Sequence, residues 1–461
     1  MRTRLPRRGQ ARILGLLTLV FLFVAADSVL QTVLPVSMTE TGAASVAVIG
    51  IMIAIPQGIG FITALPGTAF GDAHGRARVV ALHATIAAMA AGLLAVAASG
   101  RSMLWWIAPL LLFGLVRLTV WISILATVST TGDRLTMQGL NGASQRLAAA
   151  AAALISAAVI ASQGWEGAYL VICAAFVLMV PLALAVLPRT ATRSGPLVTP
   201  RASYSVAVSI VRSDRAIRAS GLAAMCCMTV MLVGNSFFAL TMTVDTGDLA
   251  ALVAILLVTR DLSSVVIGLT FKQVVNKVGL SGTVTIAVGC AATSMLILAV
   301  SGSIIVGVVA AAVLQGTSIC LLIGSTNLLA VYSSGVPTAG AALRITASQI
   351  GPSIGALIMP IVLAGALGFG GTALLYTLAT VTIIVLGAIA LLQMRPPRTA
   401  PTATTPNDIT KDGDHHEPHH RTDPTLTPHP GMPRSPHRTD PVGDLPALHP
   451  RERDLGPAPR A

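Results

Sequence analysis

Four ionisable residues stand inside long apolar runs of the sequence: Asp27, Arg117, Arg260 and Asp261. An ionised side chain is costly in hydrocarbon, so residues of this kind mark substrate sites, ion sites or proton relays. Asp27 follows the start of its apolar run by 14 residues, which places it about 21 Å along a helix. The other three lie similarly deep in their runs. We therefore predict that all four lie near the middle of a bilayer.

Polar or aromatic neighbours accompany these charges at helical spacing. Gln31 is four residues after Asp27 and Trp121 is four after Arg117, so each pair shares a helix face. In a poorly hydrated cavity Asp27 can take up a proton, and an approaching Arg117 can expel it. The alternative is a permanent structural ion pair between them. Arg260 and Asp261 point about 100° apart on a helix, so we expect each to have a partner elsewhere.

The elements that must carry these residues are membrane helices. Of the 461 residues, 54% are hydrophobic and only 10% are charged, whereas soluble domains are about 25% charged. Apolar runs of roughly 20 residues, the length that crosses a bilayer, recur along the chain. The sequence predicts an all-α membrane protein with about twelve spans, at 13–34, 45–65, 79–98, 103–128, 140–161, 165–187, 219–244, 249–270, 282–300, 303–331, 339–363 and 372–394.

The loops between these spans predict domains and orientation. The division expected is an amino-terminal six-helix half at 1–188, a central loop at 189–218, a second six-helix half at 219–394 and a disordered tail at 395–461. Basic residues, Arg146 among them in this count, collect on the side of the termini and central loop, which the positive-inside rule makes cytoplasmic. The net charge is +12, and we interpret the excess of basic residues as setting the orientation of the protein in the membrane, not as binding nucleic acid. Residues 203–217 of the central loop are either an amphipathic interfacial helix or a solvated linker.

A repeat of 204 residues indicates that the two halves are related. Asp72 and Gly75 return as Asn276 and Gly279, and the sequence Ala-Ser-Gln ending at Gln145 returns ending at Gln349. At the same spacing Asn235 stands where Gln31 stands in the first copy, and Asp261 where Gln57 stands. Matching helices of two pseudo-symmetric halves would thus present polar groups at matching depths, as a cavity between the halves requires.

The first copy of the loop motif resembles that of the major facilitator superfamily, in which it lies between the second and third helices. Asp72, Gly75 and Arg76 match that pattern, with Arg78 one place late, and the second copy keeps Asn276, Lys277 and Gly279. Gln315-Gly316 is also similar to a common family pattern. The resemblance implies that these loops latch the cytoplasmic side. The fifth span lacks the Gly-Pro motif typical of the family's drug antiporters.

The resemblance also implies a central cavity lined by the first, fourth, seventh and tenth helices. The residues expected to form it or to couple it to protons are Asp27, Gln31, Arg117, Trp121, Asn235, Arg260, Asp261, Gln315 and Gln349. Apolar side chains, Met228, Met231 and Trp121 among them, are expected to face it too, which suits a lipophilic substrate.

The predicted function is that of a secondary active transporter in the cytoplasmic membrane, with both termini cytoplasmic, working by alternating access. We expect proton-coupled efflux of a drug-like or secondary-metabolite compound. The alternatives are uptake of a small polar nutrient such as a sugar, a passive channel, or a membrane enzyme, for which no apolar run holds a catalytic motif. The expected partners are a small-molecule substrate, protons and the bilayer. The protein is expected to be a monomer with no cofactor, metal site or nucleic-acid partner.

Overall fold

The computed structural model describes residues 7–42, 45–100, 102–131, 133–190, 200–238, 240–241, 250–301, 305–332 and 341–394. Within these ranges the chain is helical, with short turns and no strand. The predicted tail at 395–461 lies outside the described residues. The domain boundaries drawn from the sequence stay predictions.

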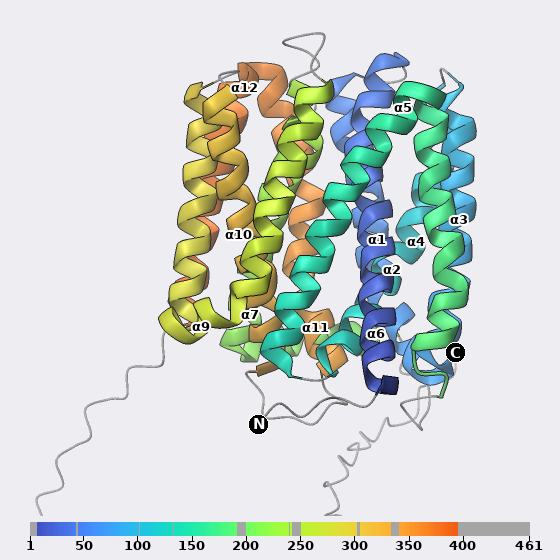
Figure 1. Ribbon diagram of the computed structural model, residues 1–461, viewed down its shortest axis with the longest axis vertical. Helices are drawn as coiled ribbons and strands as arrows, with labels where there is room; N and C mark the ends of the chain where they lie inside the picture. The colour runs from blue at the N-terminus through green and yellow to red at the C-terminus, as the bar shows by residue number, and fades with distance from the viewer. Residues whose placement is uncertain are drawn as a thin grey trace, which may run out of the picture. The chain divides into compact units, whose positions relative to one another are not determined.

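The long helices stand side by side along the height of the bundle (Figure 1). The first half contains α1 (Arg7–Glu40), α2 (Val46–His74), α3 (Arg76–Ala98), α4 (Leu104–Ser129) and α5 (Arg134–Val186). A short helix, α6 (Pro200–Ser213), precedes the second half. The second half contains α7 (Arg215–Leu232), the π-helical η1 (Val233–Phe237), α9 (Ala250–Ser301), α10 (Ile305–Tyr332), α11 (Ala341–Ser348) and α12 (Ile350–Met394).

Three of these helices are too long for one crossing, and each folds back at a glycine. The breaks are at Gly164 in α5, Gly279 in α9 and Gly371 in α12, with φ of 69°, 73° and 67°. Figure 1 shows the turns of α5 and α12 at the upper end of the bundle and that of α9 at the lower end. The described residues contain nine helices apolar enough to cross a membrane. Dividing the three broken ones yields twelve apolar segments, and twelve crossings remain the prediction for the protein in its bilayer.

Each half has its own hydrophobic core. One cluster of buried side chains lies wholly between Leu16 and Leu187, and a second lies between Ala223 and Ala390, joined by Val36 from the first half. The outer surface is apolar as well: Val300 is 88% exposed and Phe369 is 95% exposed. A soluble protein rarely carries so continuous an apolar exterior, so this surface is suited to lipid.

The loop motif, expected as a short turn between the second and third spans, is a turn of the single residue Gly75. Helix α2 continues through Asp72 to His74, Gly75 adopts φ 92°, and α3 begins at Arg76. The repeat-related Gly279 forms the equivalent turn in α9. A positive φ is accessible to glycine at no steric cost, which lets two helices leave the turn side by side.

We expect Gly75→Ala to destabilise the protein more than Gly279→Ala. Both substitutions place a side chain at positive φ with an extended ψ, a region almost confined to glycine, at a cost of about 1–3 kcal/mol. At Gly75 the new methyl group would also collide with the carbonyl oxygen of Arg189, whereas at Gly279 nothing lies within 4 Å. Thermal unfolding of the two variants in detergent checks this, and equal losses in the unfolding temperature would contradict the packing seen at Gly75.

Of the two alternatives for residues 203–217, the structure contains the helix, which ends before residue 217. It is α6, and it stops at Ser213 because Asp214 caps the next helix, accepting a 2.8 Å hydrogen bond from the backbone N–H of Ala216. The hydroxyl of Tyr204 donates to the carbonyl of Phe61 at 3.0 Å, which fastens α6 to α2.

Candidate functional site

A cavity of about 120 Å³ lies between the two halves. Helices α1, α4 and α5 line it from the first half, and α7, α10 and α12 from the second. One wall is apolar: Phe23 stacks on Trp121 with ring centroids 5.3 Å apart, and Met228 and Met231 line the cavity as the sequence predicted. The polar and charged residues of the lining are Asp27, Ser28, Gln31, Arg117, Gln145, Arg146, Thr326, Asn327 and Gln349.

The charged wall is built around Asp27 on α1. Arg117 on α4 binds this carboxylate with two nitrogens, Nε to Oδ1 at 2.5 Å and Nη2 to Oδ2 at 2.8 Å. The side-chain amide of Gln31 donates to Oδ2 at 2.6 Å, and Arg117 Nη1 donates to Oε1 of Gln57 at 2.7 Å. Both charged residues are buried. The two bonds from Arg117 and the one from Gln31 hold the Asp27 carboxylate in a fixed orientation.

A hydrogen bond links this network to the second half. Asn235 Nδ2 donates to Gln31 Oε1 at 3.1 Å, and Ser236 Oγ donates to the Gln31 carbonyl at 2.9 Å. Gln31 and Asn235 are the pair that the 204-residue repeat relates, and they meet across the boundary of the halves. Asn235 lies in η1, which directly follows α7. A chain of hydrogen bonds therefore runs from Asp27 through Gln31 to Asn235 in the second half.

A second buried ion cluster lies beside the cavity. Arg260 binds the neighbouring Asp261 through Nε at 3.0 Å and Nη2 at 2.9 Å. The expectation that each finds its partner elsewhere is wrong for Arg260, because its long side chain folds back onto the adjacent carboxylate. Asp261 also receives Arg146 from the first half, with Nη1 of Arg146 3.6 Å from Oδ1. This distance is too long for a hydrogen bond, so the second contact is looser.

The structure corrects the sequence-based placement of Arg146. The sequence count puts this residue among the cytoplasmic basic groups, but it is 1% exposed and lines the cavity with its neighbour Gln145. Arg146 follows the start of α5 by 12 residues, or about 18 Å. The signal that could have found this site is the repeat of Gln145 as Gln349, since both glutamines line the cavity.

The other predicted cavity residues divide into two groups. Five line the cavity: Asp27, Gln31, Arg117, Trp121 and Gln349. Four lie next to it instead: Asn235, Arg260, Asp261 and Gln315. Polar atoms of Arg260 and Gln315 lie against Gly234, in space that a Cβ would occupy, so only glycine leaves room for them there.

Among the described residues, the hydrogen bonds of the loop motif do not connect the two halves. Asp72 accepts from Arg76 Nε at 2.9 Å, and Arg76 Nη1 donates to Thr127 Oγ1 at 3.4 Å, so these contacts stay within the first half. The other predicted gating residues with side chains, Arg78, Asn276 and Lys277, are exposed. A latch role for the motif remains a prediction for another conformation.

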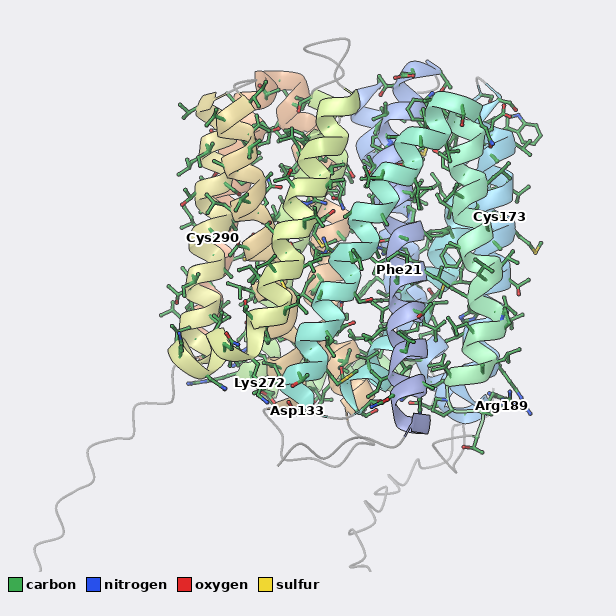
Figure 2. The ribbon with its side chains drawn as sticks, viewed as in Figure 1. Phe21, Asp133, Cys173, Arg189, Lys272 and Cys290 are labelled. Carbon is green, nitrogen blue, oxygen red and sulfur yellow. The ribbon has the colours of Figure 1, made fainter. Side chains whose placement is uncertain are left out.

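At the lower end, other residues join the halves. The ammonium of Lys272 on α9 contacts Asp133 at 3.0 Å, and Figure 2 shows the two labelled together. A hydrogen bond from Thr136, together with Lys272, holds the pKa of Asp133 below its ordinary value. Nearer the cavity, Asn327 Nδ2 donates to Gln138 Oε1 at 3.0 Å. Polar contacts therefore join the halves on both sides of the cavity.

Two helical halves around a central cavity, part apolar and part charged, are the architecture of a membrane transporter of the two-domain type. The sequence profile of the Major Facilitator Superfamily matches residues 16–356, and the chain belongs to that family. It is thus a multi-pass membrane protein of a family that transports solutes. A search of curated protein sequences finds no match.

Solved structures share the fold. The chain is similar to the human organic anion transporter MFSD10 (TETRAN), at TM-score 0.61 and 14% identity, covering 84% of this chain and 100% of that one. It is also similar to the nucleoside transporter NupG, at TM-score 0.60 and 16% identity over 84% of this chain and 99% of that one. A point mutant of NupG gives TM-score 0.63 and 15% identity, over 83% of this chain and 100% of that one.

Proposed function

We propose that this protein is a proton-coupled secondary transporter that exports a drug-like or secondary-metabolite compound across the cytoplasmic membrane. The observation that carries the proposal is the position of Asp27, which lines the cavity between the halves while its network reaches Asn235 in the other half. The protein works as a monomer, with both termini in the cytoplasm.

The geometry supports a definite coupling step. Protonation of Asp27 removes the charge that binds Arg117 and weakens the charge-assisted bond from Gln31. Gln31 then holds Asn235 less firmly, so the contact between the halves at that level loosens. Release of the proton restores Arg117 to Asp27 and closes the contact. Proton uptake is thereby converted into opening of the cavity on one side.

The apolar wall favours a compound with a substantial hydrophobic part. Phe23, Trp121, Met228 and Met231 present ring faces and flexible thioethers, which adapt to substrates of different shape. The second candidate function is uptake of a small polar nutrient, which the amides of Gln145, Asn327 and Gln349 in the same cavity would favour. One structural neighbour is a nucleoside transporter, and a nucleoside is a polar solute of the kind that this alternative requires.

Transport measured in inverted membrane vesicles separates these functions. We expect vesicles that contain the protein, acidified inside, to accumulate a lipophilic labelled compound and to lose it when the proton gradient is collapsed. A nutrient importer would instead concentrate a labelled sugar or nucleoside in whole cells. Accumulation in neither assay, over a broad solute panel and with the protein verified in the membrane, would contradict both functions.

A further inference from the structure

We propose that the cavity binds an organic anion, with the anionic group of the ligand on Arg146 and Gln145. The proposal rests on the proposed function only in that the cavity is taken as the place where a solute binds. Neither the family match nor the fold assigns a substrate class to this chain, and the proposal names one, organic anions.

The buried charges in and beside the cavity do not balance. Within the described residues, the cavity and its border contain the carboxylates Asp27 and Asp261 and the guanidinium groups of Arg117, Arg146 and Arg260. Arg117 neutralises Asp27 through two hydrogen bonds, and Arg260 neutralises Asp261 through two more. Arg146 is then left as a surplus positive charge. It lies 3.6 Å from Asp261, but that carboxylate is already paired with Arg260, so the contact is weak.

Several buried hydrogen-bond donors at the cavity are unused in the part of the chain that the structure describes. Nε and Nη1 of Arg146 and Nε2 of Gln145 are buried and make no hydrogen bond among the described residues. Both amide atoms of Asn141, one turn earlier on α5, are also unpaired within that part of the chain. Buried polar groups are nearly always satisfied, and an unpaired buried guanidinium is especially costly. Arg146 and Gln145 line the cavity, so an anion there can accept from both.

The remaining cavity wall indicates the rest of the ligand. The same cavity is lined by Trp121, Phe23 and Met228, which suit an aromatic or aliphatic body. A carboxylate attached to an aromatic ring is the simplest molecule with both features. When its oxygens bind Arg146, they satisfy the donors that Asp261 leaves unpaired, and they weaken a contact between α5 and α9 of opposite halves. Ligand binding and movement of the halves would then be linked.

Equilibrium binding of matched probes tests the proposal without any transport step. The probes are 2-naphthoate and its neutral analogue 2-naphthamide, measured on the purified full chain by calorimetry and by thermal stabilisation. We expect wild type to bind the carboxylate at least about tenfold more tightly than the amide, the effect of one charge-assisted hydrogen-bonded contact. Arg146→Gln should abolish this preference, and Arg146→Lys should keep part of it. Arg215→Gln, at an exposed arginine, should leave it unchanged.

The opposite results are equally clear. The proposal is overturned if wild type binds the amide as tightly as the carboxylate, if it binds neither, or if folded Arg146→Gln keeps the preference. If Arg146→Gln fails to fold, the proposal is tested by the wild-type comparison and by Gln145→Leu. We expect Gln145→Leu to bind the carboxylate probe more weakly than wild type does. A failure of proton coupling in transport assays would not alter these binding results, so the two proposals can fail separately.

Discussion

Asp27→Asn is expected to abolish proton-driven accumulation, so that substrate reaches equal concentrations on both sides of the membrane. Asparagine keeps the shape of the side chain and can still accept from Arg117, but it cannot take up and release a proton. Exchange of labelled for unlabelled substrate, which needs no proton gradient, should persist. Flux measurements in reconstituted vesicles with and without a gradient check both expectations.

The competing interpretation, a structural ion pair, predicts a different pattern. Removing one partner of a buried pair leaves the other charge uncompensated, at a cost of about 3–5 kcal/mol in stability. On that interpretation the double variant Asp27→Asn, Arg117→Gln would restore both stability and gradient-driven transport. In our account the double variant regains stability but not proton coupling. Gradient-driven accumulation by the double variant would rule out Asp27 as the proton carrier.

Gly316→Ala is expected to destabilise the second half by about 3 kcal/mol, which is at the upper end of the usual cost of overpacking. Helix α10 meets α9 at this glycine so closely that a Cβ would overlap the carbonyl oxygen of Arg260 and the hydroxyl of Ser263. The hydroxyl of Ser264 also donates to the Gly316 carbonyl at 2.5 Å. Because the contact includes backbone, no side-chain rotation relieves it, and the Arg260–Asp261 pair would be displaced.

A matched control for this prediction is Gly289→Ala. Gly289 is also in a helix of the second half, but nothing lies within 4 Å of a Cβ there. Alanine favours the helix over glycine by up to about 1 kcal/mol, so this variant should be neutral or slightly more stable. Thermal unfolding of both variants in detergent gives the comparison. A similar unfolding temperature for the two would contradict the packing of α10 against α9.

The general architecture is predictable because the bilayer imposes it. Apolar runs of the length that spans hydrocarbon can only be helices, and the 204-residue repeat reveals two related halves in the sequence itself. The same repeat anticipates that Gly75 and Gly279 occupy equivalent turns. It also relates Gln31 to Asn235, which form a hydrogen bond in the structure.

The parts that the sequence misses depend on side-chain direction, which a linear pattern does not contain. Arg146 is misplaced on the cytoplasmic side because a basic residue near a span end and one inside a cavity look alike in sequence. The pairing of Arg260 with its own neighbour depends on a long side chain folding back. The contact between Asp133 and Lys272 joins residues 139 apart, and only the packing of α5 against α9 brings them together.

The central claim, that the cavity opens alternately to the two sides of the membrane, is tested most directly by labelling a cysteine placed in its wall. Met231→Cys, in a background where the five native cysteines are replaced, would be exposed to a membrane-impermeant thiol reagent from each side in turn. Met89→Cys, on the outer surface of α3 with 62% exposure, is the lipid-facing control. Our account predicts that Met231→Cys is labelled from both sides and that a change of pH increases labelling from one side over the other. The control, Met89→Cys, should not be labelled from either side. Labelling from one side only, at every pH and substrate concentration, would contradict it.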